Sequence, residues 1–112
     1  ECHATEYTVW SSSKHAQAMD TLVHKQADFN PECVTCHVLG FKKKGGFVDA
    51  KSTPSLVNVQ CESCHGPGAR HLENPKAPYG RAGKQACMSC HTHDNSPSFH
   101  FETYWSKIRH GA

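Results

Sequence analysis

The sequence is poor in the aliphatic and aromatic residues that build hydrophobic cores. Leu, Ile, Val and Phe together make up 17 of its 112 residues. A chain below roughly 20% in these residues is expected to be disordered when its net charge is high. The formal net charge here is only +2, so the composition does not indicate disorder. A domain with so small an apolar core needs disulfides, metals or cofactors to complete its interior.

Long apolar runs are also lacking. No stretch approaches the roughly 18 apolar residues of a transmembrane helix, and no basic segment followed by an apolar segment marks a signal peptide. We therefore expect no membrane span. We interpret residues 1–112 as a single domain and, because the sequence begins with Glu1, as part of a longer gene product or a fragment of a longer protein.

Cysteine and histidine, in contrast, are abundant, with seven and ten residues. Six of the cysteines form three C-x-x-C-H motifs, at residues 33–37, 61–65 and 87–91. This is the attachment pattern of haem c, in which two thiols bind the porphyrin and the adjacent imidazole binds the iron. Cys2-His3 is what remains of such a motif without its first three residues, and it accounts for the odd cysteine.

These motifs predict the following haem-binding residues. The thioether cysteines are Cys2, Cys33, Cys36, Cys61, Cys64, Cys87 and Cys90, and the proximal iron ligands are His3, His37, His65 and His91. We expect four haems, three of them from complete motifs.

Other uses of cysteine fit this spacing less well. Structural zinc sites pair two C-x-x-C knuckles, so that three pairs leave one unmatched, and zinc does not require a histidine after each second cysteine. Thiols separated by two residues are more often redox-active than structural, which disfavours a disulfide scaffold. A thioredoxin-like role would need one motif between a strand and a helix.

Bis-histidine coordination of four irons needs eight histidines, and the ten in the sequence, four after a motif cysteine and six elsewhere, nearly match that number. His15 is the best distal candidate, because Ser11 to Ser13 offer an N-cap and residues 14–24 read as a helix with Ala18, Met19 and Leu22 on its buried face. His71 follows a Gly-Pro-Gly turn that lets the chain approach a macrocycle closely. His110 ends an amphipathic helix predicted for residues 103–110. His24, His93 and His100 are interpreted as more often solvated than ligating.

The predicted fold class is mainly α with little regular structure, a small multihaem cytochrome c fold wrapped around stacked haems. Residues 41–47 read as a hairpin or loose loop with Gly-Gly at its turn. Residues 66–86, with three prolines and four glycines, read mostly as loop. With about 28 residues for each haem, the porphyrins must form the core, and the apoprotein should be unfolded.

Taken together, these motifs resemble the tetrahaem cytochrome c-554 family and related bacterial multihaem cytochromes. The resemblance spans essentially the whole chain. It is carried by Glu1-Cys2-His3, Trp10, SKHA (13–16), NPECVTCHVLGF (30–41), VQCESCHGPGARH (59–71), ACMSCH (86–91) and YWSKIRH (104–110).

The resemblance implies a set of axial pairs: His65 with His15, His3 with His71, and His91 with His110. In the family's namesake the second haem, which corresponds to His37, is five-coordinate. In this sequence His24 is a candidate for its sixth ligand. The missing start of the first motif leaves open whether Cys2 forms a single thioether or residues precede it.

The first functional hypothesis is electron transfer, because bis-histidine irons have no open site for a substrate. The second is redox catalysis on nitric oxide, nitrite or hydroxylamine at a five-coordinate haem on His37. The third is a subunit of an extracellular cytochrome filament, or a haem domain of a larger chain. The sequence favours a carrier over an enzyme, and no residue is assigned a catalytic role.

The expected partners are redox proteins and other cytochromes, with a homo-oligomer or filament as a further option. We expect the three adjacent lysines at 42–44 to form a solvated face or to neutralise haem propionates. We do not interpret them as a nucleic-acid site. Attachment of haem to C-x-x-C-H takes place outside the cytoplasm, which predicts a periplasmic or extracellular location.

Overall fold

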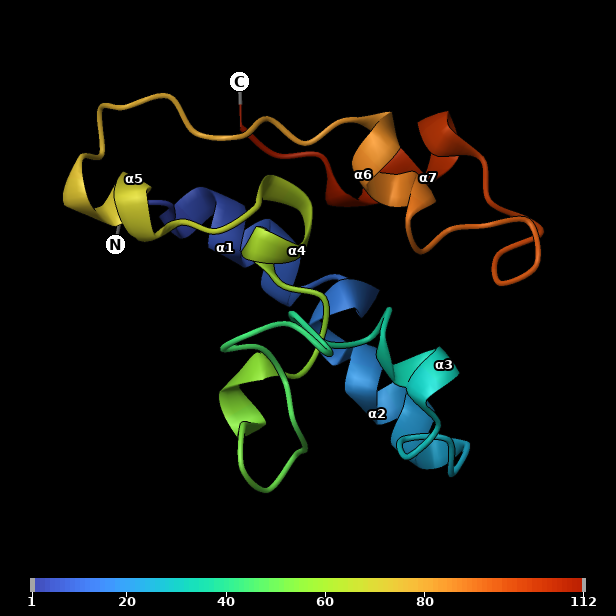
Figure 1. Cartoon of the computed structure of the whole chain (residues 1–112). Coiled ribbons are helices and arrows are strands. Elements are labelled where there is room, and N and C mark those ends of the chain that lie inside the picture. The colour runs from blue at the N-terminus through green and yellow to red at the C-terminus, as the bar shows by residue number, and fades with distance from the viewer. Residues whose placement is uncertain (1, 112) are drawn as a thin grey trace.

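Short helices joined by irregular segments make up the computed structural model, which describes residues 2–111 (Figure 1). Glu1 of the truncated motif, and Ala112, lie outside the described residues. The helices are α1 (Ala4–Ser11), η1 (Lys14–Gln17, 3-10), α2 (Ala18–His24), α3 (Pro31–Val34), η2 (Pro54–Leu56, 3-10), α4 (Cys61–His65), α5 (Ala69–Glu73), α6 (Lys84–Met88) and α7 (Phe101–Ile108). Between residues 2 and 111, strand-like pairing is limited to one antiparallel bridge, Val38 to Val57. The predicted mainly α class with little regular structure is confirmed.

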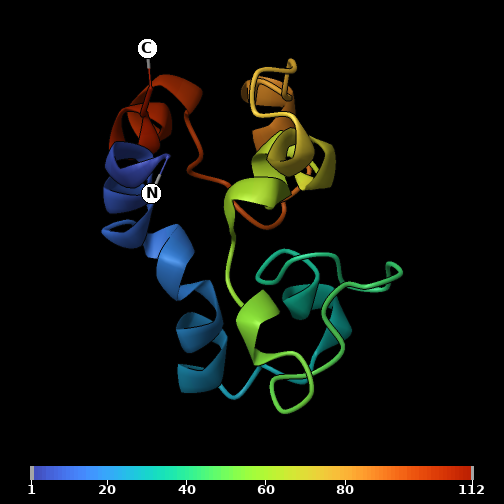
Figure 2. The same cartoon turned by 90° about the vertical axis from the view of Figure 1, so that its left-hand side faces the viewer.

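The helix predicted for residues 14–24 is interrupted, with His15 in η1 and the apolar residues in α2. An uninterrupted α-helix would bond the amide of Met19 to the carbonyl of His15. Instead, Asn58 Oδ1 accepts a hydrogen bond from the Met19 amide (2.8 Å), and the Val59 amide donates to the His15 carbonyl (3.1 Å). The segment at residues 58–59 therefore separates the two helices. Figure 2 shows α1, η1 and α2, in blue, running along one side of the molecule.

The N-cap predicted before this helix also differs. Ser13 makes no side-chain cap, and its hydroxyl donates a hydrogen bond to the Trp10 carbonyl instead (2.6 Å). The Trp10 indole in turn donates to the Val59 carbonyl (2.6 Å). These bonds tie α1 to the same segment that interrupts the helix.

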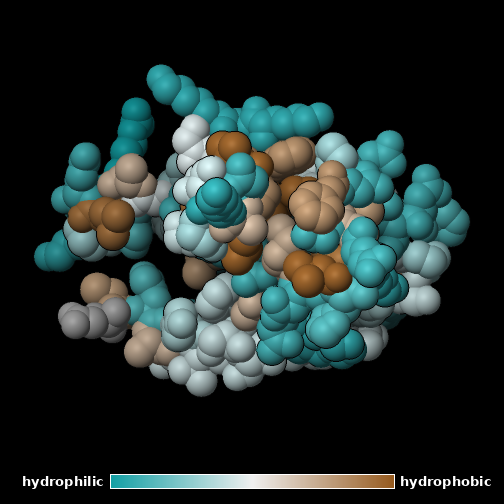
Figure 3. Space-filling model, turned by 90° about the horizontal axis from the view of Figure 1, so that it is seen from below, coloured by the Kyte–Doolittle hydropathy of each residue, from teal (hydrophilic) through white to brown (hydrophobic). Residues whose placement is uncertain are grey.

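The apolar core is small and lies in the first half of the chain. Its buried members are Met19, Leu22, Val34, Val38 and Phe47, with Ala18 also buried. The buried face predicted for the first helix is thus confirmed. Among the described residues from 48 onward none is buried, so that the second half has no apolar core made of side chains alone. Large apolar side chains remain exposed, and Figure 3 shows apolar patches among hydrophilic atoms on one face.

The loop at residues 40–47 closes on itself as the two glycines predict. The Lys43 amide donates to the Gly40 carbonyl (3.0 Å), and the Phe47 amide donates to the Leu39 carbonyl (2.9 Å). The backbones of Gly40 and Gly46 approach so closely that a side chain on Gly46 would overlap the Gly40 carbonyl. Phe47 is thereby directed into the core.

The second half consists of short helices around a long irregular segment. α4 packs against α6, and Gly66, with φ +82°, begins the turn that leads into α5. Between α5 and α6 lies the irregular segment, as predicted for most of residues 66–86. The predicted C-terminal helix is displaced by two residues, since α7 ends at Ile108 and His110 follows it in irregular chain. No helix between residues 2 and 111 has the length and apolar character to cross a membrane.

Candidate functional site

Each complete C-x-x-C-H motif begins in a single helical turn. α4 contains the whole of its motif, while α3 and α6 contain Cys33 and Cys87 and are followed by turns that hold the rest. A helical turn directs residues i and i+3 to the same side, so both thiols of each motif face one way. Local capping begins two of these turns: Asn30 Oδ1 accepts from the Glu32 amide (3.0 Å), and Gln60 forms a capping box with Ser63.

The proximal histidines of these motifs are held through Nδ1. His37 Nδ1 lies 2.7 Å from the Ala18 carbonyl oxygen, and His65 Nδ1 lies 2.6 Å from the Gly80 carbonyl oxygen. A carbonyl can only accept, so each ring carries its proton on Nδ1 and leaves Nε2 free to bind a metal. Such a bond also fixes the orientation of a ligating ring.

The structure brings six histidines together in three pairs. Ring centroids are 6.0 Å apart for His3 and His71, 6.2 Å for His15 and His91, and 6.1 Å for His65 and His110. An imidazole nitrogen binds a transition metal at about 2 Å and its ring centre lies about 1 Å further away, so two imidazoles on opposite sides of one iron have centres about 6 Å apart. All three pairs have this spacing.

Each pair joins a histidine that follows a motif cysteine with one that does not. The pair of His3 with His71 is the one that the family resemblance implies. The other two partners are exchanged: His15 lies beside His91 and not His65, and His110 lies beside His65 and not His91. The contacts of residues 58–59 with His15 and Met19, and the end of α7 at Ile108, are the features that place these two residues.

Burial keeps the His15 and His91 pair in the neutral form. Desolvation, with smaller contributions from the nearby His91 and His37, lowers the pKa of His15. Desolvation likewise lowers the pKa of His91. A neutral imidazole is the form that binds a metal, so the environment favours the ligating state of both rings.

The cysteines of different motifs are close neighbours. All seven are free thiols. Burial, together with the adjacent Cys90 side chain, raises the pKa of Cys36 to about 11. Burial, with Cys87, Cys90 and Cys61 nearby, also raises the pKa of Cys64. Cys36 and Cys64 therefore favour the uncharged thiol, and the attachment positions of the motifs that end at His37, His65 and His91 adjoin one another.

His37 differs from the other motif histidines. None of the ring pairs at this spacing includes it. His24, the candidate for its sixth ligand, is the last residue of α2 and is exposed. No ring contact found in the described part of the chain involves His24, so the structure does not bring these two imidazoles together as an axial pair.

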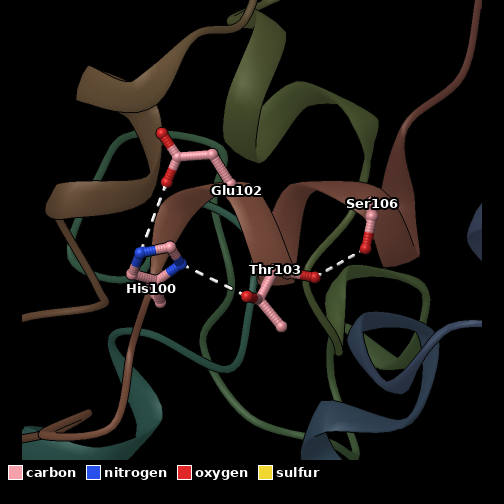
Figure 4. A network of polar contacts seen from close by, with 4 residues as sticks. All are labelled: His100, Glu102, Thr103 and Ser106. Atoms are coloured by element: carbon pink, nitrogen blue, oxygen red, sulfur yellow. Dashed lines mark hydrogen bonds and ion pairs between the residues drawn. The ribbon is translucent and has the colours of Figure 1, made fainter.

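His100 and His93 lie outside the pairs. Figure 4 shows the His100 ring between two side chains, with Nδ1 3.2 Å from the Thr103 hydroxyl and Nε2 3.6 Å from the Glu102 carboxylate. Both ring nitrogens thus have partners in the first turn of α7, which leaves neither free for a metal. His93 is exposed.

Sequence reasoning missed several residues that surround the pairs. Tyr79 stacks beside the rings of both His65 and His71, with centroid distances of 6.0 Å and 4.9 Å. Phe99 stacks on His91 at 4.5 Å, and the Ser96 hydroxyl lies 3.1 Å from His91 Nδ1. All three lie in irregular segments, where no periodicity or motif spacing would have identified them.

The residues present fit haem c. Three pairs of imidazoles have the spacing of axial ligands, the thiols are free, and the described second half of the chain buries no side chain of its own. Within residues 2–111, no group of three or more His, Cys, Asp or Glu side chains is arranged to hold a metal ion. Paired imidazoles suit a porphyrin iron, whose four equatorial ligands come from the macrocycle.

Comparison with known proteins identifies the family. Residues 1–66 match the family described as cytochrome c554 and c-prime. Cytochrome c-554 of Nitrosomonas europaea is 33% identical over 119 aligned positions, which cover 90% of this chain and 50% of the relative. Multiheme cytochrome MtrA of Shewanella baltica is 26% identical over 113 positions, covering 80% of this chain and 34% of the relative. C-type polyheme cytochrome OmcB of Geobacter sulfurreducens is 31% identical over 61 positions, covering 54% and 8%.

The chain thus spans about half the length of cytochrome c-554 and less of the other relatives. No solved structure shows significant similarity to it. The match covers the first motif remnant and the motifs that end at His37 and His65, together with His15. The chain therefore belongs to the cytochrome c554 and c-prime family and is a multihaem c-type cytochrome.

Proposed function

We propose that this chain transfers electrons between redox partner proteins by means of four haems. The proximal ligands of their irons would be His3, His37, His65 and His91. The observation that carries the proposal is the set of three imidazole pairs with centroids 6.0 to 6.2 Å apart. Bound haem supplies an iron that gains and loses one electron. Imidazoles on both faces of an iron leave no position for a substrate, which suits a carrier.

Within the proposal, the chain's own residues have distinct roles. Cys2, Cys33, Cys36, Cys61, Cys64, Cys87 and Cys90 hold the porphyrins. Nδ1 hydrogen bonds from His37 to Ala18 and from His65 to Gly80 orient proximal rings and increase their basicity. His15, His71 and His110 complete the axial pairs.

The arrangement of the motifs supports stepwise passage of electrons in a spatial order that differs from the order in the sequence. Cys36 neighbours Cys90, and Cys64 neighbours Cys87 and Cys90. Tyr79 connects the ring of His65 to that of His71, which pairs with His3. The proposed order is therefore His37, His91, His65 and His3.

A second candidate function is redox catalysis on a small nitrogen compound, such as nitric oxide, nitrite or hydroxylamine, at a five-coordinate haem on His37. It is favoured by one observation: His37 belongs to none of the imidazole pairs, although its Nδ1 bond to Ala18 orients the ring as in the other motifs. No nearby side chain is assigned as an acid or base.

A third candidate is that this chain is one haem-bearing domain of a larger chain, or a subunit of an extracellular cytochrome filament; the partial matches to longer multihaem cytochromes support the first of these. MtrA and OmcB are matched over 34% and 8% of their lengths. Other cytochromes are the expected partners. We further propose a periplasmic or extracellular location, because haem is attached to C-x-x-C-H outside the cytoplasm.

A spectroelectrochemical titration of the haem-loaded protein, with haem counted by the pyridine haemochrome assay, tests the proposal. Electron transfer predicts four haems in each chain and reversible uptake of four electrons. Nitric oxide is then added to the reduced protein. Binding to one haem in four, followed by turnover, would favour catalysis at His37, and a haem count below three would contradict both functions.

A further inference from the structure

Tyr79 occupies a position shared by two of the imidazole pairs. Its ring stacks on His71 with centroids 4.9 Å apart and 10° between the planes. The Tyr79 ring also stacks on His65, with centroids 6.0 Å apart and 23° between the planes. His71 pairs with His3, and His65 pairs with His110. The Tyr79 ring therefore contacts two histidines that are assigned as ligands of different irons.

Tyr79 is itself held firmly by the turn after α4. Its hydroxyl donates a hydrogen bond to the Gly66 carbonyl, and a Cβ on Gly68 would lie only 3.3 Å from that hydroxyl oxygen. The next residue, Gly80, accepts the bond from His65 Nδ1 (2.6 Å). Residues 79–80 therefore contact the segment from His65 to Gly68 through hydrogen bonds and close packing. These contacts set the orientation of the Tyr79 ring.

His71 lacks the hydrogen bond that orients other ligands. Its Nδ1 is buried and has no hydrogen-bond partner among residues 2–111, whereas His37 and His65 are each fixed through Nδ1 by a carbonyl oxygen. A ligating ring without such a bond can rotate about its bond to the metal. Stacking on the Tyr79 ring is a contact that would restrict this rotation.

We propose that Tyr79 is a positioning residue, which sets the rotation of the His71 imidazole and links it to that of His65. This inference rests on the proposed function, because it assigns His71 and His65 as axial ligands. Tyr79 is assigned no catalytic role. It acts through the angle between the two imidazole planes of each pair, on which the largest g-value of a low-spin ferric haem depends.

The test uses the full chain with its haems attached and compares Tyr79→Leu with Tyr79→Phe by electron paramagnetic resonance. Tyr79→Leu should broaden and shift the low-spin signals of two haems and leave that of the His15 and His91 pair unchanged. Tyr79→Phe keeps the ring and should restore most of the original spectrum. Phe29→Leu, at a side chain that is 87% exposed, is the matched control and should change nothing.

Two other results would overturn the proposal: an unchanged spectrum in Tyr79→Leu, or equal shifts of all low-spin signals. If the Tyr79→Leu variant does not fold, Tyr79→Met takes its place in the comparison with Tyr79→Phe, because Met fills the space without a ring. A wild-type protein without bis-histidine signals would contradict the proposed function itself. The two failures are thereby distinguished.

Discussion

The imidazole of His15 lies 6.2 Å from that of His91, with 46° between the ring planes. One residue comes from the 3-10 helix η1 and the other from the turn after α6, so the contact joins the two halves of the chain. Desolvation lowers the pKa of both rings and holds them in the neutral form that a metal requires.

Replacing His15 with Ala should remove the sixth ligand from the haem on His91. The expected result is loss of one low-spin signal and appearance of a high-spin one in the electron paramagnetic resonance spectrum. The signal lost should be the one that Phe99→Leu perturbs, since Phe99 stacks on His91. If it is instead the signal that a substitution at Gly80 perturbs, His15 pairs with His65 as the resemblance implies, because the Gly80 carbonyl accepts from His65 Nδ1.

Ser96→Ala should raise the midpoint potential of the haem on His91. Its hydroxyl lies 3.1 Å from His91 Nδ1, and losing this bond makes the imidazole less basic, so that the ferric state is less stabilised. A hydrogen bond worth about 1 kcal/mol corresponds to a shift of tens of millivolts. Potentiometric titration measures the shift, and Ser98→Ala, at an exposed serine of the same loop, serves as control.

Gly80→Ala should destabilise the loaded protein by about 1–3 kcal/mol, as overpacking does. A Cβ at Gly80 would lie 2.5 Å from the His65 carbonyl oxygen. This overlap would push the backbone at Gly80 away from His65. At Gly83, nothing lies within 4 Å of such a Cβ, and Gly83→Ala should therefore be nearly neutral. Urea denaturation followed by haem absorbance compares the two, and equal effects would contradict the close approach.

His24→Ala should leave the spin states of all haems unchanged. The side chain is exposed at the end of α2 and pairs with no other ring in the described residues. Absorbance and paramagnetic resonance spectra of the ferric protein provide the measurement. A new high-spin signal in this variant would identify His24 as the sixth ligand of the His37 haem.

Much of the site could be predicted from sequence because covalent attachment requires a fixed spacing. The C-x-x-C-H residues, the buried face of α2 and the candidacy of His15, His71 and His110 all followed from local patterns. Which distal ring meets which proximal ring could not be predicted from these patterns. That choice depends on long-range contacts, such as the insertion of Asn58 between His15 and Met19.

Residues that support the site were less accessible to sequence reasoning. Tyr79 and Ser96 lie in irregular segments, where neighbours are set by turns and not by a helical or strand period. Because α7 ends two residues earlier than predicted, His110 lies beyond the helix in irregular chain, where its Nδ1 is 2.7 Å from the Ile108 carbonyl oxygen. Helix ends depend on tertiary contacts that a local pattern does not contain.

The most direct measurement of the central claim is the number of bis-histidine haems in the ferric protein, obtained by near-infrared magnetic circular dichroism and calibrated against the pyridine haemochrome count. The three imidazole pairs predict three bis-histidine haems and one haem without a second histidine ligand. Fewer than three bis-histidine haems, or methionine ligation at any of these sites, would contradict the account.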